Sequence, residues 1–277
     1  MKNKVKAILS AALVAMVVFT GCASTSGNNN GEDKDIFKVG LEAAYAPFNW
    51  TQKDDSNGAV KIEGSSDYAG GYDVEIAKRI ADGLGKELVI VKTEWTGLIP
   101  ALQSGTIDAI VAGMSPTEER LEAIDFSDIY YKSDLVIVVK NGGKYEDANK
   151  LADFSGAKIT GQLNTFHYSV IEQIDGVIKE NAMDDFSAMR VALESGMIDG
   201  YVTERPEGVS AEAANESFKM IELQDGFETS LEDTAIAVGL TKGSNLTDKI
   251  NEILSKISEE ERQQLMDEAI KNQPAAQ

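Results

Sequence analysis

Two stretches of this chain are near copies of each other, and this internal repeat limits the folds open to it. Residues 101–108 (ALQSGTID) and 192–199 (ALESGMID) match at six of eight positions. Each copy has the pattern of a helix end, a glycine that can adopt the left-handed cap conformation, and the start of an apolar strand. The repeat predicts two similarly built α/β lobes; the alternative is that two helix ends share a Ser-Gly cap by chance. Ligands of open α/β sheets bind beyond the carboxyl ends of the strands, so two lobes predict one ligand cleft between them.

The first residues predict export and attachment to a membrane. Three lysines precede an apolar run at residues 7–19. This pattern is typical of a secretory signal at residues 1–21, which is too short to persist as a membrane-spanning helix. Residues 19–22 (FTGC) resemble a bacterial lipobox, with Phe19 where leucine is usual, and the resemblance implies that Cys22 is lipidated. Ordinary secretion with an incidental cysteine is the alternative. Residues 22–35 are polar and glycine-bearing and predict a flexible tether.

The composition excludes several classes of partner. The net charge is −20, from 26 basic and 46 acidic residues, which argues against nucleic acid and against flat binding to an anionic membrane. The single cysteine cannot form a disulfide within the chain, so a hydrophobic core must stabilise the fold. One histidine without a cluster of cysteine or aspartate predicts no metal site, and we expect no cofactor and a monomer.

The apolar pattern predicts an alternation of strands and helices, which indicates α/β lobes with mostly parallel sheets. The expected strands are residues 36–41, 87–91, 107–111, 135–139, 158–161, 198–202, 218–223 and 234–240. The expected helices are residues 72–84, 97–103, about 165–180, a helix that starts at Arg205, and two helices at the carboxyl end. The last of these opens with a capping box of Ser258 and Glu261. Residues 54–67 are polar and predict a loop or a hairpin.

Five motifs, in order, resemble the polar amino acid-binding proteins of ABC importers. The motifs are residues 39–48 (VGLEAAYAPF), 71–77 (GYDVEIA), 98–102 (LIPAL), 115–120 (SPTEER) and 125–127 (DFS), and the resemblance covers about residues 36–270. It implies a type II periplasmic-binding-protein fold, with two lobes joined by two crossing hinge segments at about residues 132–134 and 229–233.

The resemblance also implies a division of the chain and a mode of action. Lobe 1 would comprise residues 36–132 and 233–277, and lobe 2 residues 133–232. Such proteins close around one amino acid and deliver it to a membrane permease.

The motif at residues 115–120 predicts a binding partner for the ligand carboxylate. Ser115 in the cap position, Pro116 in the first helical position and Glu118 in the third predict a helix start that favours an anion. Arg120 lies in the first turns of that helix, and its guanidinium can hold a carboxylate with two parallel bonds. The resemblance implies that Ser115 and Arg120 bind the ligand carboxylate. The alternative is a cap and a surface ion pair.

The ammonium and the side chain of the ligand need acidic partners. Glu204 follows the second repeated strand as Gly113 follows the first. The resemblance implies that Glu204 binds the ammonium, although the family usually has aspartate there; a solvated glutamate beside Arg205 is the alternative. Glu42 stands where binders of basic amino acids carry an aspartate, which favours arginine, lysine, ornithine or histidine. Glutamine, cystine-like or other polar ligands remain open.

Aromatic residues are expected around the ligand side chain. Tyr45 and Trp95 match positions that sandwich it, because aromatic faces hold an aliphatic stem and attract a cationic head. Phe48 and Trp50 are more typical of core or hinge packing.

In the second lobe, residues 162–167 (QLNTFH) match the family's second carboxylate loop. Gln162, Thr165 and Phe166 are therefore further site residues, and Asn164 stands where glycine is usual. Whether His167, the sole histidine, contacts the ligand is left open.

The leading prediction is an extracytoplasmic, lipid-anchored binding protein, not an enzyme, that delivers a polar L-amino acid to an ABC permease. A dehydratase-type enzyme on the same fold, with an acid such as Glu204 in a dry cleft, is one alternative. An amino acid-sensing or adhesion lipoprotein is the other.

Overall fold

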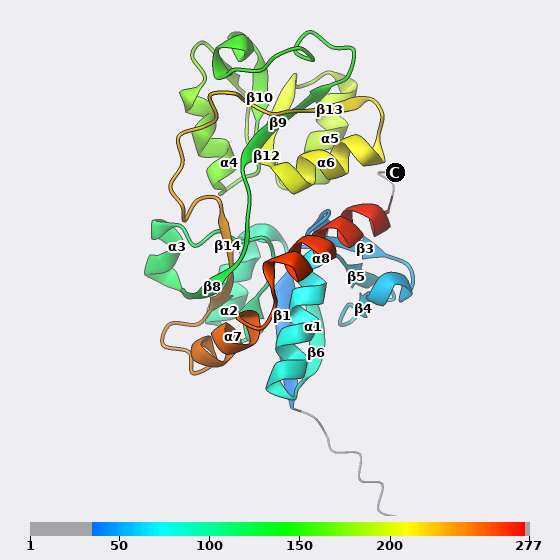
Figure 1. The fold of residues 1–277 in the computed structure, drawn as a ribbon, viewed down its shortest axis with the longest axis vertical. Coiled ribbons are helices and arrows are strands. Elements are labelled where there is room, and N and C mark those ends of the chain that lie inside the picture. The colour runs from blue at the N-terminus through cyan, green and yellow to red at the C-terminus, as the bar shows by residue number, and fades with distance from the viewer. Residues whose placement is uncertain (1–34, 275–277) are drawn as a thin grey trace, which may run out of the picture. The chain divides into compact units, whose positions relative to one another are not determined.

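The computed structural model describes residues 35–274, which belong to one compact unit of the chain. The predicted signal, the predicted lipidation site Cys22 and the tether up to residue 34 lie outside the described residues. Two five-stranded sheets and one four-stranded sheet organise the described part (Figure 1). Among residues 35–274, no helix is both long enough and apolar enough to cross a bilayer.

The first sheet has the strand order β6-β1-β7-β14-β8. β1 pairs in parallel with β6 and β7, whereas β14 is antiparallel to β7 and β8. The strands are β6 (Glu87–Lys92), β1 (Ile36–Leu41), β7 (Ala109–Ile110), β14 (Ala235–Leu240) and β8 (Asp125–Lys132). The late strand β14 is therefore part of the sheet that begins at residue 36.

The second sheet has the order β11-β10-β12-β9-β13 and repeats the same pattern of pairing. β10 is parallel to β11 and β12, while β9 is antiparallel to β12 and β13. The strands are β11 (Ile178–Lys179), β10 (Lys158–Thr160), β12 (Gly200–Glu204), β9 (Leu135–Lys140) and β13 (Phe218–Ile221). The two repeated strands, β7 and β12, are the middle strands of their sheets.

The prediction of two similarly built α/β halves is confirmed by this match in pairing. The expectation of mostly parallel sheets was wrong in part, because each sheet is mixed, with two of its four strand pairs antiparallel. The chain crosses between the sheets twice, from β8 to β9 and from β13 to β14 (Figure 1). These crossings include the two predicted hinge segments, whereas the division into separate lobes stays a prediction.

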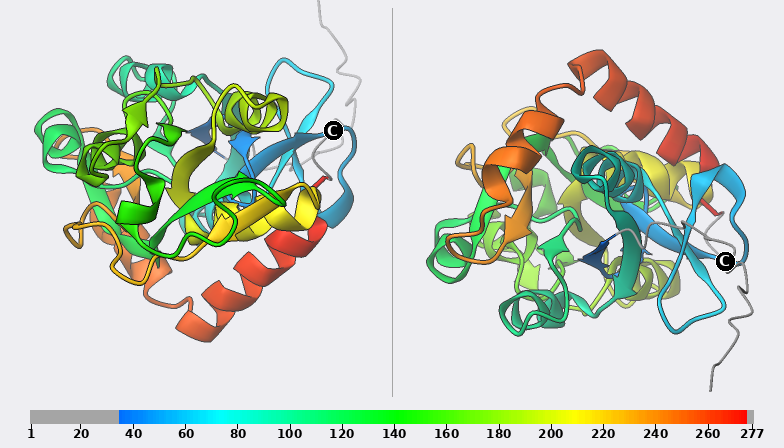
Figure 2. Two further views of the ribbon diagram at one scale, coloured as in Figure 1. Left: turned by 90° about the horizontal axis from the view of Figure 1, so that it is seen from above. Right: turned by 90° about the horizontal axis from the view of Figure 1, so that it is seen from below.

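The helices cover the sheets and begin and end close to the predicted residues in most cases. They are α1 (Tyr72–Leu84), α2 (Leu98–Gln103), α3 (Glu118–Ala123), α4 (Phe166–Ser169), α5 (Phe186–Ser195), α6 (Arg205–Ala214), α7 (Thr247–Leu254) and α8 (Glu259–Asn272). Helix α8 lies beside α1 and α6 (Figure 1 and Figure 2). Ser258 caps α8, because its Oγ accepts a bond from the Glu261 N–H at 3.1 Å, whereas the Glu261 side chain accepts bonds from Arg79 instead of completing the predicted capping box.

The two copies of the repeat make the same backbone contacts. Gly105 and Gly196 follow the helix ends with positive φ angles of 74° and 77°, a conformation that glycine adopts without steric cost. Asp108 Oδ2 accepts a bond from Lys38 N at 2.8 Å, and Asp199 Oδ2 accepts one from Lys158 N at 2.9 Å. Each aspartate thus ties the start of a middle strand to its parallel neighbour.

One local prediction was confirmed and two were wrong in part. The hairpin expected as one possibility for residues 54–67 is present, because β4 pairs antiparallel with β5, in a sheet of the order β2-β3-β5-β4. The strands are β2 (Ala44–Tyr45), β3 (Asn49–Gln52), β5 (Tyr68–Gly70) and β4 (Val60–Lys61). The helix expected at about residues 165–180 is only the four-residue α4 followed by a 3₁₀ turn at Val170–Gln173. The repeated strand expected at 107–111 is assigned only at β7; the Ile107 N–H still bonds back to the Ala101 carbonyl at 3.4 Å, whereas the Asp108 N–H bonds to the Lys38 carbonyl of β1 at 2.8 Å.

The strand β9 explains why an unbroken apolar run forms a strand here. Ile137 and Val139 belong to one hydrophobic cluster and Val138 to the other, so both faces of β9 are covered. A strand that is buried on both faces has no polar alternation.

Candidate functional site

The predicted site residues come from the carboxyl ends of strands in both sheets. Glu42 follows β1 and Gly113 follows the β7 segment, whereas Gln162 follows β10 and Glu204 ends β12. Nine of the ten predicted residues, together with His167, line one inner pocket of about 10 Å³. The lining residues are Tyr45, Trp95, Gly113, Ser115, Arg120, Gln162, Thr165, Phe166, His167 and Glu204. This volume is about that of one water probe, so the side chains themselves nearly fill the pocket.

Glu204 lines the inner pocket and is held by two neighbouring side chains. The Tyr45 hydroxyl donates a hydrogen bond to Glu204 Oε2, and His167 Nε2 lies 2.9 Å from Glu204 Oε1. Burial raises the pKa of Glu204 to about 8, and the neighbouring charge of Glu207 adds to the shift. The alternative of a solvated glutamate paired with Arg205 is wrong, because Glu204 is buried and Arg205 pairs with Glu222 at 2.5 Å.

Glu42, the tenth predicted residue, joins the pocket through Gln162. The Gln162 side-chain amide donates to Glu42 Oε2 at 3.0 Å and also to the Asp184 carbonyl at 3.0 Å. The other carboxyl oxygen, Glu42 Oε1, is buried and has no hydrogen-bond partner among the described residues. Burial raises the pKa of Glu42 to about 8, although the bond from Gln162 opposes the shift. A buried carboxyl with an unused oxygen can accept a donor from a ligand.

The predicted helix start at Ser115 needs a correction. Helix α3 begins at Glu118, and Thr117 is its cap, because Thr117 is extended and its hydroxyl accepts a bond from Arg120 N at 3.4 Å. Ser115 instead donates its hydroxyl hydrogen to the Asp233 carbonyl at 2.9 Å. Ser115 lines the pocket but does not cap the helix, and a six-residue helix contributes little as a source of dipole.

Arg120 connects residues from both sheets at the edge of the pocket. Its guanidinium donates to the Ser115 carbonyl at 2.9 Å and to the Asn164 carbonyl at 3.0 Å. It also lies over the Trp95 ring, with Cζ 5.0 Å from the ring centroid. The two bonds use two of the five guanidinium N–H donors, which leaves donors for an anion. Burial lowers the pKa of Arg120 to about 10, so the group stays charged at neutral pH.

Asn164 shows why a residue other than glycine is tolerated in the second loop. Its φ angle is 56°, in the left-handed region that asparagine enters more readily than most residues. Its carbonyl accepts bonds from Arg120 and from Trp95 Nε1, the latter at 3.4 Å. The next residue, Thr165, donates its hydroxyl hydrogen to the Gln162 carbonyl at 2.7 Å and so fixes the loop.

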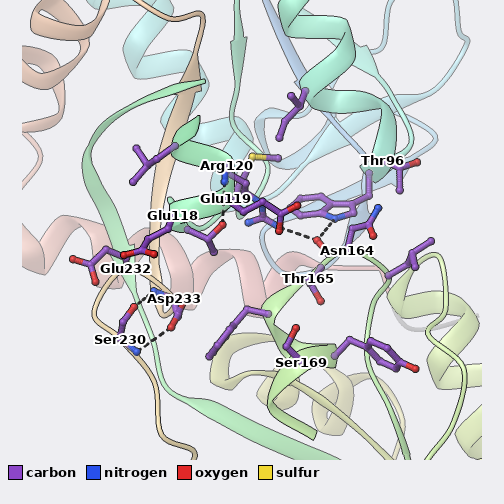
Figure 3. Close-up of a pocket in the computed structure, with 18 residues that line it drawn as sticks. Thr96, Glu118, Glu119, Arg120, Asn164, Thr165, Ser169, Ser230, Glu232 and Asp233 are labelled. Carbon is purple, nitrogen blue, oxygen red and sulfur yellow. Dashed lines mark hydrogen bonds between the residues drawn. The ribbon is translucent and has the colours of Figure 1, made fainter. Parts of the chain in front are cut away.

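A larger cavity of about 1060 Å³ adjoins the inner pocket and shares Trp95, Arg120, Thr165 and Phe166 with it. Figure 3 shows Arg120 and Asn164 on one side of this outer cavity. The charged side chains that line it are mostly acidic. Arg120 is the one basic residue among the described residues there, and the acidic residues are Glu118, Glu119, Glu232 and Asp233 (Figure 3). The acidic lining of the outer cavity therefore favours cations.

Close packing fixes Tyr45, one of the residues that line the inner pocket. Tyr45 stacks on Phe186 with ring centroids 4.3 Å apart, and Gly113 lies so close to Tyr45 that an added Cβ would meet its Cε1 at 2.7 Å. Phe48 and Trp50 line neither cavity and are buried, as expected for core residues.

Sequence reasoning missed Phe186 and left His167 undecided. Phe186 opens α5 directly after the cap Asp185, and nothing local in the sequence indicates that it meets a residue as distant as Tyr45. The signal for His167 was its place in the predicted loop. Among residues 35–274, no group of three His, Cys, Asp or Glu side chains is placed to hold a metal ion.

Comparisons with known proteins show which proteins the chain is similar to. The family of bacterial extracellular solute-binding proteins, family 3, matches residues 37–271. A probable histidine-binding protein of Campylobacter jejuni is 34% identical over 225 residues, which cover 74% of this chain and 80% of that protein. The arginine-binding extracellular protein ArtP of Bacillus subtilis is 28% identical over 257 residues, or 91% of each chain.

A solved structure has the same fold. It is an amino acid ABC transporter substrate-binding protein from Streptococcus pneumoniae bound to L-arginine, 26% identical, with a TM-score of 0.75. The match covers 85% of this chain and 94% of that chain.

Proposed function

This chain belongs to family 3 of the bacterial extracellular solute-binding proteins, and from that premise we propose that it binds an L-amino acid with a cationic side chain for an ABC permease. The proposed ligands are arginine, lysine, ornithine and histidine. The names of the relatives support this range, since they include a probable histidine-binding and an arginine-binding protein.

The charge pattern of the inner pocket carries the proposal. A basic amino acid has one anionic and two cationic groups. The pocket offers the inverse set, with the guanidinium of Arg120 and the carboxyls of Glu204 and Glu42. Buried carboxylates are costly unless they are paired, so a ligand with two cations can ionise both glutamates. A ligand with a neutral side chain would leave Glu42 uncharged and unmatched.

Each ligand group has a proposed partner. The carboxylate binds the remaining donors of Arg120, together with Ser115, Thr165 and the backbone near Gly113. The ammonium binds Glu204, and the cationic side chain binds Glu42 between Tyr45 and Trp95. Gln162 and Phe166 complete the wall of the pocket.

The inner pocket is too small for an amino acid as it stands, so binding requires its walls to move apart. We propose that lobe 1 (residues 36–132 and 233–277) and lobe 2 (residues 133–232) open and close about the two crossing segments. Lipidation of Cys22 would hold the protein at the outer face of a cell membrane beside its permease.

A panel of amino acids tests the proposal. The purified protein is melted with each of the twenty L-amino acids and ornithine, and those that raise the melting temperature are titrated by calorimetry. We expect one site for a cationic amino acid with a Kd near micromolar or tighter, or about −8 kcal/mol. If no amino acid raises the melting temperature or gives heat, the proposal is wrong.

Two variants separate the parts of the site. Arg120→Ala should weaken every ligand by roughly 2–5 kcal/mol, because it leaves the ligand carboxylate without its charged partner. Glu42→Gln should weaken arginine far more than glutamine. Glu63→Gln is the matched control, because Glu63 is an exposed acid that pairs with Lys38. An equal loss for arginine and glutamine in Glu42→Gln would remove Glu42 from side-chain recognition.

A further inference from the structure

The single histidine of the chain lies beside Glu204 in the inner pocket. His167 is in α4 and is 7% exposed, and its Nε2 lies 2.9 Å from Glu204 Oε1. Its ring meets Phe186 edge-on, with centroids 6.1 Å apart at 71°. Its other nitrogen, Nδ1, is buried and has no hydrogen-bond partner among the described residues. The ring is therefore packed in place and directs one nitrogen to Glu204.

The two contacts that hold Glu204 come from different parts of the fold. Tyr45 belongs to β2, on the first-sheet side of the pocket, whereas α4 packs on β12, the strand that ends in Glu204. A movement that separates the two sheets would break the bond from Tyr45 but leave His167 beside Glu204. His167 is thus the partner that stays when the site opens to receive a ligand.

We propose that His167 is a positioning residue for ligand binding, which holds one oxygen of Glu204 and donates its Nε2–H to that oxygen when the ligand's ammonium ionises the carboxyl. The inference rests on the proposed function and adds a residue to it. Glu204 has one more rotatable bond than the aspartate usual at this place, so a second group is needed to fix its carboxyl.

The charges around the pair agree with this role. Burial lowers the pKa of His167 to about 3, with a contribution from the positive charge of Arg120, so the ring is neutral and keeps one N–H to donate. The titratable and charged groups that face Glu204 are His167 from α4, Tyr45 from β2, Glu207 from α6 and Arg120 from α3. Loss of the His167 donor would make the carboxylate of Glu204 harder to form, which would raise its pKa further.

The test is the pH dependence of L-arginine binding. Calorimetry between pH 6 and 8.5 compares the wild-type protein with His167→Phe, which keeps an aromatic ring, and His167→Gln, which keeps an N–H donor. For the wild type, affinity should rise with pH, because Glu204 and Glu42 both have a raised pKa and ionise more easily at higher pH. In His167→Phe, affinity at pH 7 should fall roughly ten- to a hundredfold, the range expected for a lost bond to a charged group. In His167→Phe, the increase of affinity with pH should also occur at higher pH than in the wild type. His167→Gln should restore part of the affinity at pH 7 and part of the shift in pH.

Controls keep the outcomes distinct. Tyr145→Phe removes a hydroxyl from a buried ring that lines neither cavity and should leave binding unchanged. Melting curves without ligand show whether each variant folds. A wild-type protein that binds no amino acid would overturn the proposed function and this inference together. Normal binding by His167→Phe, or a loss that is equal at every pH, would overturn the inference alone.

A spectroscopic measurement tests the inference without a variant. Because the chain has one histidine, the imidazole ¹⁵N spectrum of the untagged protein contains a single ring. With L-arginine bound, we expect a neutral ring with hydrogen on Nε2 from pH 5 to 8. A ring that gains a proton near pH 6.5, as a solvated histidine does, would contradict the proposal.

Discussion

Asn164 shows how one backbone conformation determines a contact between two distant parts of the chain. Its left-handed φ of 56° turns its carbonyl to both Arg120 and Trp95. The bonds are made by the backbone, so the identity of the side chain matters through the conformation that it permits.

This conformation predicts opposite outcomes for two small substitutions at residue 164. Asn164→Ala should lower the free energy of unfolding by about 1 kcal/mol, because alanine disfavours positive φ. Asn164→Gly should leave it within about 0.5 kcal/mol. Urea unfolding measures the stability, and calorimetry should show weaker ligand binding in Asn164→Ala than in Asn164→Gly. If alanine is tolerated as well as glycine, the left-handed conformation is not required.

At the scale of secondary-structure elements, the repeat is a structural unit with a specific contact. In both copies a helix ends at a left-handed glycine, and an aspartate binds the backbone N–H of the neighbouring strand. The two repeated strands are central in their sheets, so an error in their alignment would affect the strands on both sides.

The equivalence of the copies can be measured. Asp108→Ala and Asp199→Ala should each lower the free energy of unfolding by about 1 kcal/mol, because each leaves one backbone N–H without its carboxylate acceptor. Asp82→Ala, at an exposed position on α1, is the matched control and should change it by less than about 0.5 kcal/mol. A clear loss in one copy but none in the other would show that the two units are not equivalent.

At the scale of the whole molecule, the chain has a net charge of −20 and also buries several acidic side chains. Glu42 and Glu204 both have a pKa of about 8, and burial raises the pKa of Asp73 to about 6. Asp73 is satisfied within the fold, since it accepts bonds from Tyr130 at 2.7 Å and Asn49 at 2.8 Å. Among the described residues, Glu42 Oε1 has no hydrogen-bond partner, and Glu204 is held by Tyr45 and His167 without a cationic partner, which agrees with a ligand site.

These groups predict how stability depends on pH without ligand. In the unfolded chain, Glu42 and Glu204 lose their protons near their ordinary pKa of 4.5, whereas the folded protein keeps them up to about pH 8. The contribution of these two groups to the free energy of unfolding is therefore fully present below about pH 4.5 and is lost as the pH rises to about 8. Urea unfolding at pH 5.5 and pH 8 should show a lower free energy of unfolding at pH 8.

The net charge of −20 acts in the same direction through repulsion, so a variant is needed to separate the causes. In the double variant Glu42→Gln and Glu204→Gln, the loss between pH 5.5 and pH 8 should be clearly smaller. If the double variant loses as much free energy of unfolding between pH 5.5 and pH 8 as the wild type, the pH dependence arises from the surface charge or from Asp73.

The sequence alone determined the elements whose causes are local. The bounds of β1 and α1, the start of α6 at Arg205 and the cap of α8 at Ser258 all agree with the structure. Periodicity, proline and capping residues act within a few positions of each other, so they can be recognised in the sequence. The repeat indicated two similar halves for the same reason.

Tertiary structure alone decided which distant residues meet. Thr117 rather than Ser115 caps α3, because the Ser115 hydroxyl bonds to the Asp233 carbonyl. That contact joins residues far apart in the sequence and is visible only in the folded chain. The pairs of Tyr45 with Phe186 and of His167 with Glu204 join segments that no local pattern relates. Their energies depend on burial and distance in the folded protein, and those quantities exist only once the two sheets have been brought together.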